Sequence, residues 1–226
     1  MFEPTLRPLI ALKGGKSRGY AIDCGLRGAR SARTVLRRLA ASDVERVDLA
    51  ALDAGLKALA AREERVRAPL LVLPAAFATF NSKRGRAQLL EHAAFAREAL
   101  QATVILEVTS LPTGLAASRL VDLIGLIRPA CEAVFVRIRP GKGVAAALDG
   151  CTLNGVALEA CDLDAPEDGP AMIRLLLILR MIGPTVMLHN LRSMAAIHAA
   201  REAGATYASF DLTHMSHEMP ETAATK

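Results

Sequence analysis

Aromatic residues are scarce in this chain of 226 residues: they make up 4% of it, and tryptophan is absent. The core must therefore be built from Ala, Leu, Val and Ile, which suits helices packed against strands. Hydrophobic residues make up 52% and the mean hydropathy is +0.27, which excludes a disordered chain. No linker divides the sequence, so we expect one domain over residues 1–212 and a disordered tail over residues 213–226.

Cysteine is also scarce, and its spacing shows no pairing. No CxxC motif is present, which argues against a zinc site and against a disulfide framework. Reduced cysteines packed as small hydrophobic side chains fit a cytoplasmic protein better. The four residues are Cys24, Cys131, Cys151 and Cys161.

Segments that would place the chain in or across a membrane are missing too. No signal-peptide pattern opens the sequence. The most apolar run, Met172–Ile182, carries Arg174 and Arg180 and is too short to span a bilayer. We therefore expect a cytoplasmic protein with no membrane insertion.

The net charge is +5 and the pI is about 9.3, values that raise the question of nucleic-acid binding. The arginines are spread along helices, and no aromatic residues lie between them to stack on bases. We therefore expect no nucleic-acid partner.

Extended and helical segments alternate along the chain, a pattern typical of a parallel sheet. About eight strands without a break predict an α/β fold, a closed TIM-type (β/α)8-like barrel. The segment between Arg139 and Gly155 looks irregular and predicts a shortened or missing helix. The expected strands are Leu9–Leu12, Tyr20–Cys24, Pro69–Leu73, Val104–Thr109, Ala133–Ile138, Gly155–Cys161, Thr185–His189 and Thr206–Phe210. The expected helices are Ser31–Leu39, Val47–Ala61, Arg86–Leu100, Ser118–Arg128, Pro170–Met181 and Ser193–Ala203, with Ser193 as an N-cap and Gly204 as a stop.

Polar residues share one face of four expected strands. Because strand side chains alternate, Phe135, Ala157 and Met187 point inward together with a polar set. That polar set is Glu107, Arg137, Arg139, Glu159 and His189. Buried charges must pair or bind a ligand. Three interpretations follow: an internal ion-pair layer, which the mixed signs favour; a ligand-binding mouth at the strand ends; and a metal site, which the arginines oppose.

Several segments in order carry a family resemblance. The opening FEPTLRPLIALKGGKSRGYAI is similar to a strand pair with a Q-P-I-type strand and a G-x-E-A-L strand. APLLVLPAAFATF is similar to a strand with an N-x-S motif, and VILEVTSLP to an L-E-I-T-E-S strand. VMLHNLRSMAAIHAAREAGATYAS is similar to an A-E-G-V-E-T turn, a helix and a final strand. Together the segments resemble the EAL domain family, barrel phosphodiesterases that hydrolyse cyclic di-GMP.

The chain departs from that family at most of its motif positions. Of the metal-binding glutamates that the resemblance implies, only Glu107 is kept. The other positions hold Arg7 for the glutamine, Ala21 for the signature glutamate, Pro74 for the asparagine, Ser110 for an acid, Arg137 and Arg139 near the paired aspartates, and His189 and Arg192 for the acids of the last turn. Such an enzyme needs clustered carboxylates to hold divalent metals, so the resemblance is to a degenerate member. We expect no catalytic residue, no metal and no cofactor.

Three hypotheses about function follow. The first is a catalytically inactive EAL-like domain with a regulatory or scaffolding role, bound to a protein partner and possibly a homodimer. The second is a metal-independent sensor that binds cyclic di-GMP, which is not favoured, or another phosphate-containing ligand at the basic mouth of the barrel. The third is an enzyme of other chemistry, with Glu107, Glu159 and His189 in acid-base roles. The candidate ligand-binding residues are Arg7, Glu107, Arg137, Arg139, Glu159, His189 and Arg192.

Overall fold

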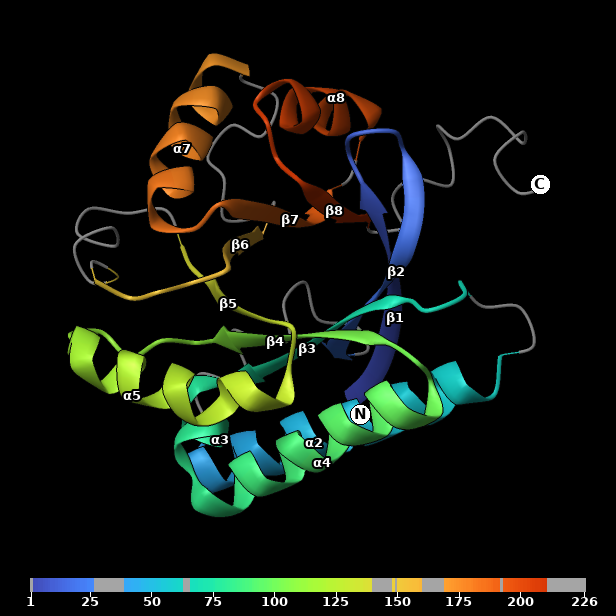
Figure 1. Cartoon of the computed structure of the whole chain (residues 1–226), viewed down its shortest axis with the longest axis vertical. Coiled ribbons are helices and arrows are strands. Elements are labelled where there is room, and N and C mark those ends of the chain that lie inside the picture. The colour runs from blue at the N-terminus through green and yellow to red at the C-terminus, as the bar shows by residue number, and fades with distance from the viewer. Residues whose placement is uncertain are drawn as a thin grey trace.

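Eight strands close into a barrel in the order in which they occur along the chain (Figure 1). The computed structural model describes residues 2–26, 39–62, 66–139, 148, 150–159, 169–191 and 193–210. The predicted α/β barrel is therefore confirmed. The strands are β1 Phe2–Ala11, β2 Lys16–Leu26, β3 Leu70–Ala76, β4 Thr103–Thr109, β5 Ala133–Arg137, β6 Gly155–Glu159, β7 Thr185–Leu191 and β8 Tyr207–Phe210.

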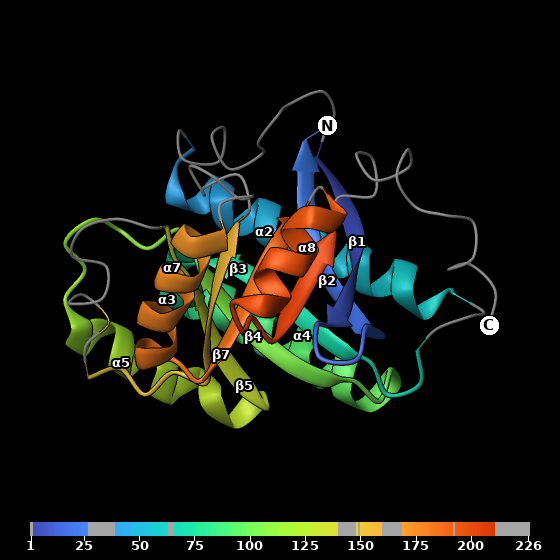
Figure 2. The same ribbon diagram turned by 90° about the horizontal axis from the view of Figure 1, so that it is seen from above.

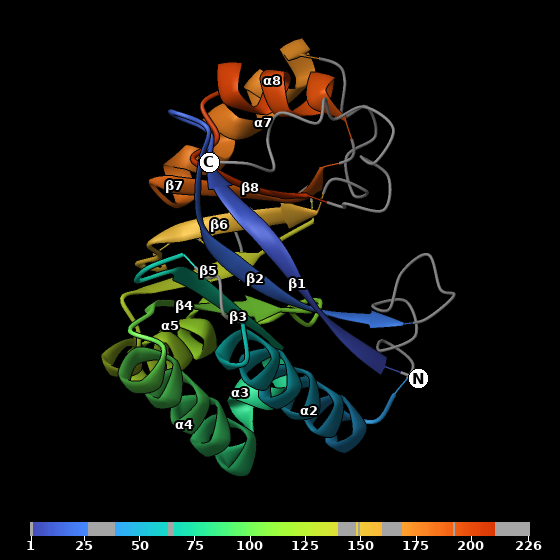
Figure 3. The ribbon, with the colours of Figure 1, turned by 90° about the vertical axis from the view of Figure 1, so that its right-hand side faces the viewer.

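The first strand differs from the prediction in both length and direction. β1 begins at Phe2 rather than Leu9, and it pairs antiparallel with both β2 and β8, while all other neighbours are parallel. Figure 3 shows β1 and β2 as a long pair that crosses the barrel. Gly14 and Gly15, with φ of 96° and 64°, allow the tight turn between them. A short turn can join only antiparallel strands, so an all-parallel sheet was the wrong expectation.

Helices cover the outside of the barrel, with α2 to α5 below and α7 and α8 above in Figure 1. Five of the six predicted helices are present, and Ser193 caps α8 because its Oγ accepts from the backbone N–H of Ala196. Gly204 has the positive φ, 85°, of a helix stop. The helices are α2 Ala41–Ala60, α3 Phe77–Asn81, α4 Lys83–Ala99, α5 Ala117–Ile127, α7 Gly169–Ile182 and α8 Met194–Glu202, with a 3-10 turn, η1, at Arg128–Ala130. The short α3 was not predicted.

A layer of apolar side chains fills the barrel lumen. Its members lie on seven strands and are Leu9, Ala21, Val72, Ile105, Phe135, Ala157 and Met187. The largest is Phe135, and Gly155 on the next strand makes room for it. A Cβ atom at Gly155 would lie 2.5 Å from Phe135 Cζ and 2.7 Å from the Thr185 carbonyl oxygen. The inward direction predicted for Phe135, Ala157 and Met187 is confirmed.

The barrel is closed at the segment that the sequence predicts to be irregular. Phe135, Val136 and Arg137 of β5 pair directly with Gly155, Val156 and Ala157 of β6. Of the connection between them, residue 148 and residues 150–154 are described and form no helix. Some expectations fall outside the described residues: the helix at 31–38, residues 140–147 and 149, the side chain of Cys24, Cys161, Arg192 and the tail from residue 211. Within the described part of the chain, no helix is long and apolar enough to cross a membrane.

Candidate functional site

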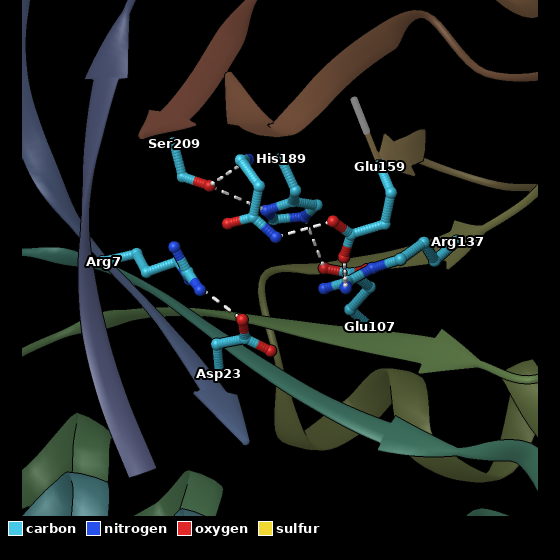
Figure 4. A network of polar contacts seen from close by, with 8 residues as sticks. Arg7, Asp23, Glu107, Arg137, Glu159, His189 and Ser209 are labelled. Carbon is cyan, nitrogen blue, oxygen red and sulfur yellow. Dashed lines mark hydrogen bonds and ion pairs between the residues drawn. The ribbon is translucent and has the colours of Figure 1, made fainter. Parts of the chain in front are cut away.

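A polar layer lies inside the barrel next to the apolar one, toward the C-terminal ends of the parallel strands (Figure 4). On each of four strands the polar residue follows an apolar lumenal residue by two positions. Glu107 follows Ile105, Arg137 follows Phe135, Glu159 follows Ala157, and His189 follows Met187. Period-two alternation thus aims all four side chains into the lumen, as predicted. In barrels of this kind, the C-terminal strand ends are where binding and catalytic groups lie.

Arg137 links the two glutamates. Its Nε donates to Glu107 Oε1 and its Nη1 donates to Glu159 Oε1. Strand register places Glu107 beside Phe135 and Arg137 beside Ala157, so the long arginine side chain is needed to reach both acids. None of the three side chains is more than 7% exposed. The predicted internal ion-pair layer is therefore present.

His189 joins the other oxygen of Glu107 to β8. Its Nε2 lies 3.0 Å from Glu107 Oε2, and its Nδ1 lies 3.1 Å from Ser209 Oγ. Because an ionised carboxylate only accepts, the Nε2–H is the donor toward Glu107. His189 is 2% exposed and Ser209 is fully buried, which holds the imidazole ring in one orientation.

Asn190 completes the network through an irregularity in β7. The pairing of β7 with β8 shifts register between Leu188 and Leu191, and Asn190 has a φ of 61°. Asparagine tolerates this left-handed conformation better than most residues. Strict alternation would point Asn190 away from His189, yet its Nδ2 donates to Glu159 Oε2 at 2.6 Å. Its backbone N–H donates to Ser209 Oγ at 3.3 Å.

Each of the four carboxylate oxygens of this pair of glutamates has a donor from the protein. Glu107 accepts from Arg137 and His189, and Glu159 accepts from Arg137 and Asn190. Buried carboxylates with a full set of donors form a stable, oriented network. These five residues, with Ser209, are called the lumen network below.

A second ion pair lies on the β1–β2 side of the lumen. Arg7 Nε donates to Asp23 Oδ2 at 2.9 Å, and both side chains are partly buried (Figure 4). Arg7 was predicted at the mouth of the barrel, but Asp23 was not recognised as its partner. The carboxylate of Asp23 balances the positive charge with which Arg7 would bind a phosphate.

A cavity of about 310 Å³ lies beside this pair, between α2 and the ends of β2, β3 and β4. Among the described residues that line it, the charged side chains are the carboxylates of Asp23 and Asp48. Asp48 is buried and accepts from the backbone N–H of Ala76 at 2.8 Å and from Thr79 Oγ1 at 2.6 Å. These carboxylates make the cavity unfavourable for a phosphate.

The predicted candidate residues therefore fall into four groups. Glu107, Arg137, Glu159 and His189 lie together in the lumen network, and Arg7 pairs with Asp23. Arg139 was expected to point inward, but β5 ends at Arg137 and Arg139 is exposed. Arg192 lies outside the described residues.

Sequence reasoning missed Asn190 and Ser209. Alternation on β8 could have found Ser209, because Tyr207 two residues earlier packs against the apolar layer. Alternation could not find Asn190, because the bulge in β7 redirects its side chain.

Solved structures of EAL-domain proteins share this fold. The standalone EAL protein of Vibrio cholerae O395, bound to c-di-GMP, is 14% identical with a TM-score of 0.70, over 93% of this chain and 90% of that one. Bacillus subtilis YkuI, with an EAL domain, c-di-GMP and calcium, is 13% identical with a TM-score of 0.69, over 92% of this chain and 53% of that one. Klebsiella pneumoniae BlrP1, with manganese and cyclic di-GMP, is 12% identical with a TM-score of 0.63, over 93% of this chain and 55% of that one.

These similarities define an EAL-like barrel. No protein-family model and no curated protein matches the sequence. The chain spans only about half the length of YkuI and BlrP1, so those proteins have regions with no counterpart in it.

The lumen network does not fit the divalent cations seen in two of those structures. A cation held by Glu107 and Glu159 would need oxygens that now accept hydrogen bonds from Arg137, His189 and Asn190. The guanidinium of Arg137 also places a fixed positive charge between the two acids. Among the described residues, no group of three or more His, Cys, Asp or Glu side chains is arranged to hold a metal ion.

Proposed function

We propose that this chain is an EAL-like barrel that does not hydrolyse cyclic di-GMP and instead has a regulatory or scaffolding role through a protein partner. One observation carries the proposal: protein donors engage all four carboxylate oxygens of Glu107 and Glu159. The guanidinium of Arg137 lies between the two acids and offsets part of their negative charge, which weakens them as ligands for a metal ion.

The chemistry of phosphodiester hydrolysis explains why this observation matters. Metal-assisted hydrolysis needs cations that activate water and neutralise the phosphate. If a metal ion took both carboxylates as ligands, the Arg137 guanidinium would be left buried without these partners, which costs several kcal/mol. The network thus opposes metal binding by its own stability.

The surroundings of the lumen also favour a protein partner over a phosphate-containing ligand. Arg7 is paired with Asp23, and the adjacent cavity is lined by the carboxylates of Asp23 and Asp48. Anions are therefore disfavoured in the cavity beside Arg7. On the outside of the barrel, by contrast, α7 exposes large apolar side chains.

The test is a hydrolysis assay on the purified chain with cyclic di-GMP and saturating Mg²⁺ or Mn²⁺. We expect no linear product above the background measured with EDTA. A phosphodiesterase with measured activity toward cyclic di-GMP serves as the positive control. Turnover that depends on metal and is lost in Glu107→Gln would contradict the proposal.

A direct metal titration by calorimetry separates failure to bind metal from failure to react. We expect no heat of Mn²⁺ binding to the wild-type chain. Saturable Mn²⁺ binding that Glu107→Gln abolishes would show that the lumen network opens, and would also overturn the proposal.

A further inference from the structure

Helix α7 is apolar on both of its faces. Leu176 and Leu179 are buried against the barrel. Ile173, Leu177 and Met181 point the other way and are 41%, 57% and 89% exposed. A helix that is apolar all round is normally buried on all sides. The outward face of α7 is thus a surface suited to contact.

The exposed apolar side chains form a ridge. Ile173, Leu177 and Met181 are spaced by four residues, so they line up along α7 over about 12 Å. Ile178, which is 52% exposed, lies beside them. Four of the eight large apolar side chains that are exposed among the described residues lie on this one helix. We call Ile173, Leu177 and Met181 the α7 ridge.

Two arginines flank the ridge. Arg174 and Arg180 precede and follow Leu177 by three residues, which places them on opposite sides of it around the helix. Both are exposed, and the sequence of α7 contains no acidic residue. The surface is therefore an apolar strip with positive charge on both sides. Figure 2 shows α7 on the outside of the barrel beside α8.

We propose that the α7 ridge docks a partner protein through an amphipathic helix whose apolar stripe is flanked by carboxylates. Ridge packing would bury Leu177 and Met181, and the carboxylates would pair with Arg174 and Arg180. This is the common mode of helix recognition, with anchors one turn apart. The inference rests on the proposed function, in which the barrel acts through a protein partner.

A second copy of the chain fits this surface poorly. A two-fold axis at Leu177 would bring Arg174 and Arg180 of both copies into one contact, and α7 has no acidic residue to pair with them. Like charges in an interface oppose association.

A membrane surface fits poorly as well. Binding to a bilayer strengthens with the apolar area that can enter it, and Leu176 and Leu179 of α7 are already buried against the barrel.

The test uses two fluorescently labelled helical peptides of about 20 residues, long enough to form helix. Both carry a leucine stripe, flanked by glutamates in one peptide and by lysines in the other. Fluorescence anisotropy with the full chain measures each affinity. We expect the acidic peptide to bind at least tenfold more tightly than the basic one.

Three variants locate the binding. Leu177→Glu should weaken acidic-peptide binding at least about 30-fold, the effect of an interface hot spot. Leu126→Glu on α5 is the matched control, because Leu126 is also 57% exposed, and it should leave the affinity unchanged. The double variant Arg174→Glu/Arg180→Glu should reverse the preference between the two peptides. Circular dichroism confirms that each variant is folded.

Other outcomes overturn the proposal. These are binding of neither peptide, equal weakening by Leu126→Glu and Leu177→Glu, or an unchanged preference in the double variant. A dimer in sedimentation that Leu177→Glu dissolves would assign the ridge to a second copy. Binding to phosphatidylglycerol vesicles that Leu177→Glu abolishes would assign it to a membrane. Failure here is separate from failure of the proposed function, because metal-dependent hydrolysis does not enter these measurements.

Discussion

Replacing Arg137 by methionine tests the balance of charge in the lumen network. Methionine keeps much of the length of the side chain but supplies no donor and no charge. Glu107 and Glu159 then each lose the hydrogen bond to Oε1, while His189 and Asn190 still donate to the other oxygens. Two like charges remain in the barrel interior without a cation between them.

The size of the effect follows from burial. Glu107 is fully buried and Glu159 is 4% exposed, so solvent cannot screen the charges. Removing one partner of a buried ion pair costs about 3–5 kcal/mol. For a domain of this size each kcal/mol lowers Tm by about 2–4 °C, so we expect Arg137→Met to lower Tm by about 6–20 °C.

The assays are thermal unfolding, which gives Tm, and urea unfolding, which gives the free energy of unfolding; both are followed by far-ultraviolet circular dichroism. Arg201→Met is the control, because Arg201 is exposed on α8; its stability should stay within about 0.5 kcal/mol of wild type. The triple variant Arg137→Met/Glu107→Gln/Glu159→Gln should recover most of the loss, because it removes the uncompensated charges. If the free energy of unfolding of Arg137→Met lies within about 1 kcal/mol of the wild-type value, the reasoning about buried charge is refuted. It is also refuted if the triple variant is no more stable than Arg137→Met.

The Arg137→Met variant also tests whether a metal cation can occupy the position of the Arg137 guanidinium. In Arg137→Met, Glu107, Glu159 and His189 are left as a potential ligand set. Mn²⁺ at tenfold its Kd would stabilise the variant by about 1.4 kcal/mol, and the wild type should show no shift. Equal Mn²⁺ effects on both proteins would mean that the ion binds elsewhere.

Three further predictions concern the rest of the fold. Burial lowers the pKa of His92 below its ordinary value of 6.5, so the unfolded state binds more protons, and stability should fall as pH drops below about 6.5. Urea unfolding at pH 7 and pH 5 should show a smaller loss for His92→Gln. Gly155→Ala would force a Cβ atom against Phe135 Cζ, at 2.5 Å, and should cost about 1–3 kcal/mol and lower Tm in calorimetry. Asp48→Ala removes the acceptor for Thr79 Oγ1 and should cost about 1–3 kcal/mol, with faster hydrogen exchange at the start of α3, whereas Asp48→Asn should lose less.

The lumen network offers a structural reason for the presence of Glu107. Glu107 is the one acid that matches the metal-binding positions of the family that the sequence resembles. In the structure its two oxygens accept from Arg137 and His189. Internal pairing therefore accounts for a buried glutamate at this position.

Much of the architecture could be predicted from the sequence. Alternating strand and helix patterns predicted the barrel, because each pattern buries one face of its own element. Period-two alternation also aimed Glu107, Arg137, Glu159 and His189 into the lumen, because it depends only on the local geometry of a strand. Mixed charges on one buried face then implied pairing, whatever the partners were.

The choice of partners needed the tertiary structure. Register between strands determines which side chains lie close enough to bond, and register is set by long-range pairing and turns. The hairpin at Gly14 and Gly15 reversed β1, and the bulge at Asn190 brought an amide to Glu159 that alternation points elsewhere. The sequence by itself determined that the lumen would be charged. The pairing of β5 with both β4 and β6 decided that Arg137 would satisfy both acids, and the closure of the barrel brought His189 of β7 to Glu107 of β4, because these two strands are not neighbours in the sheet.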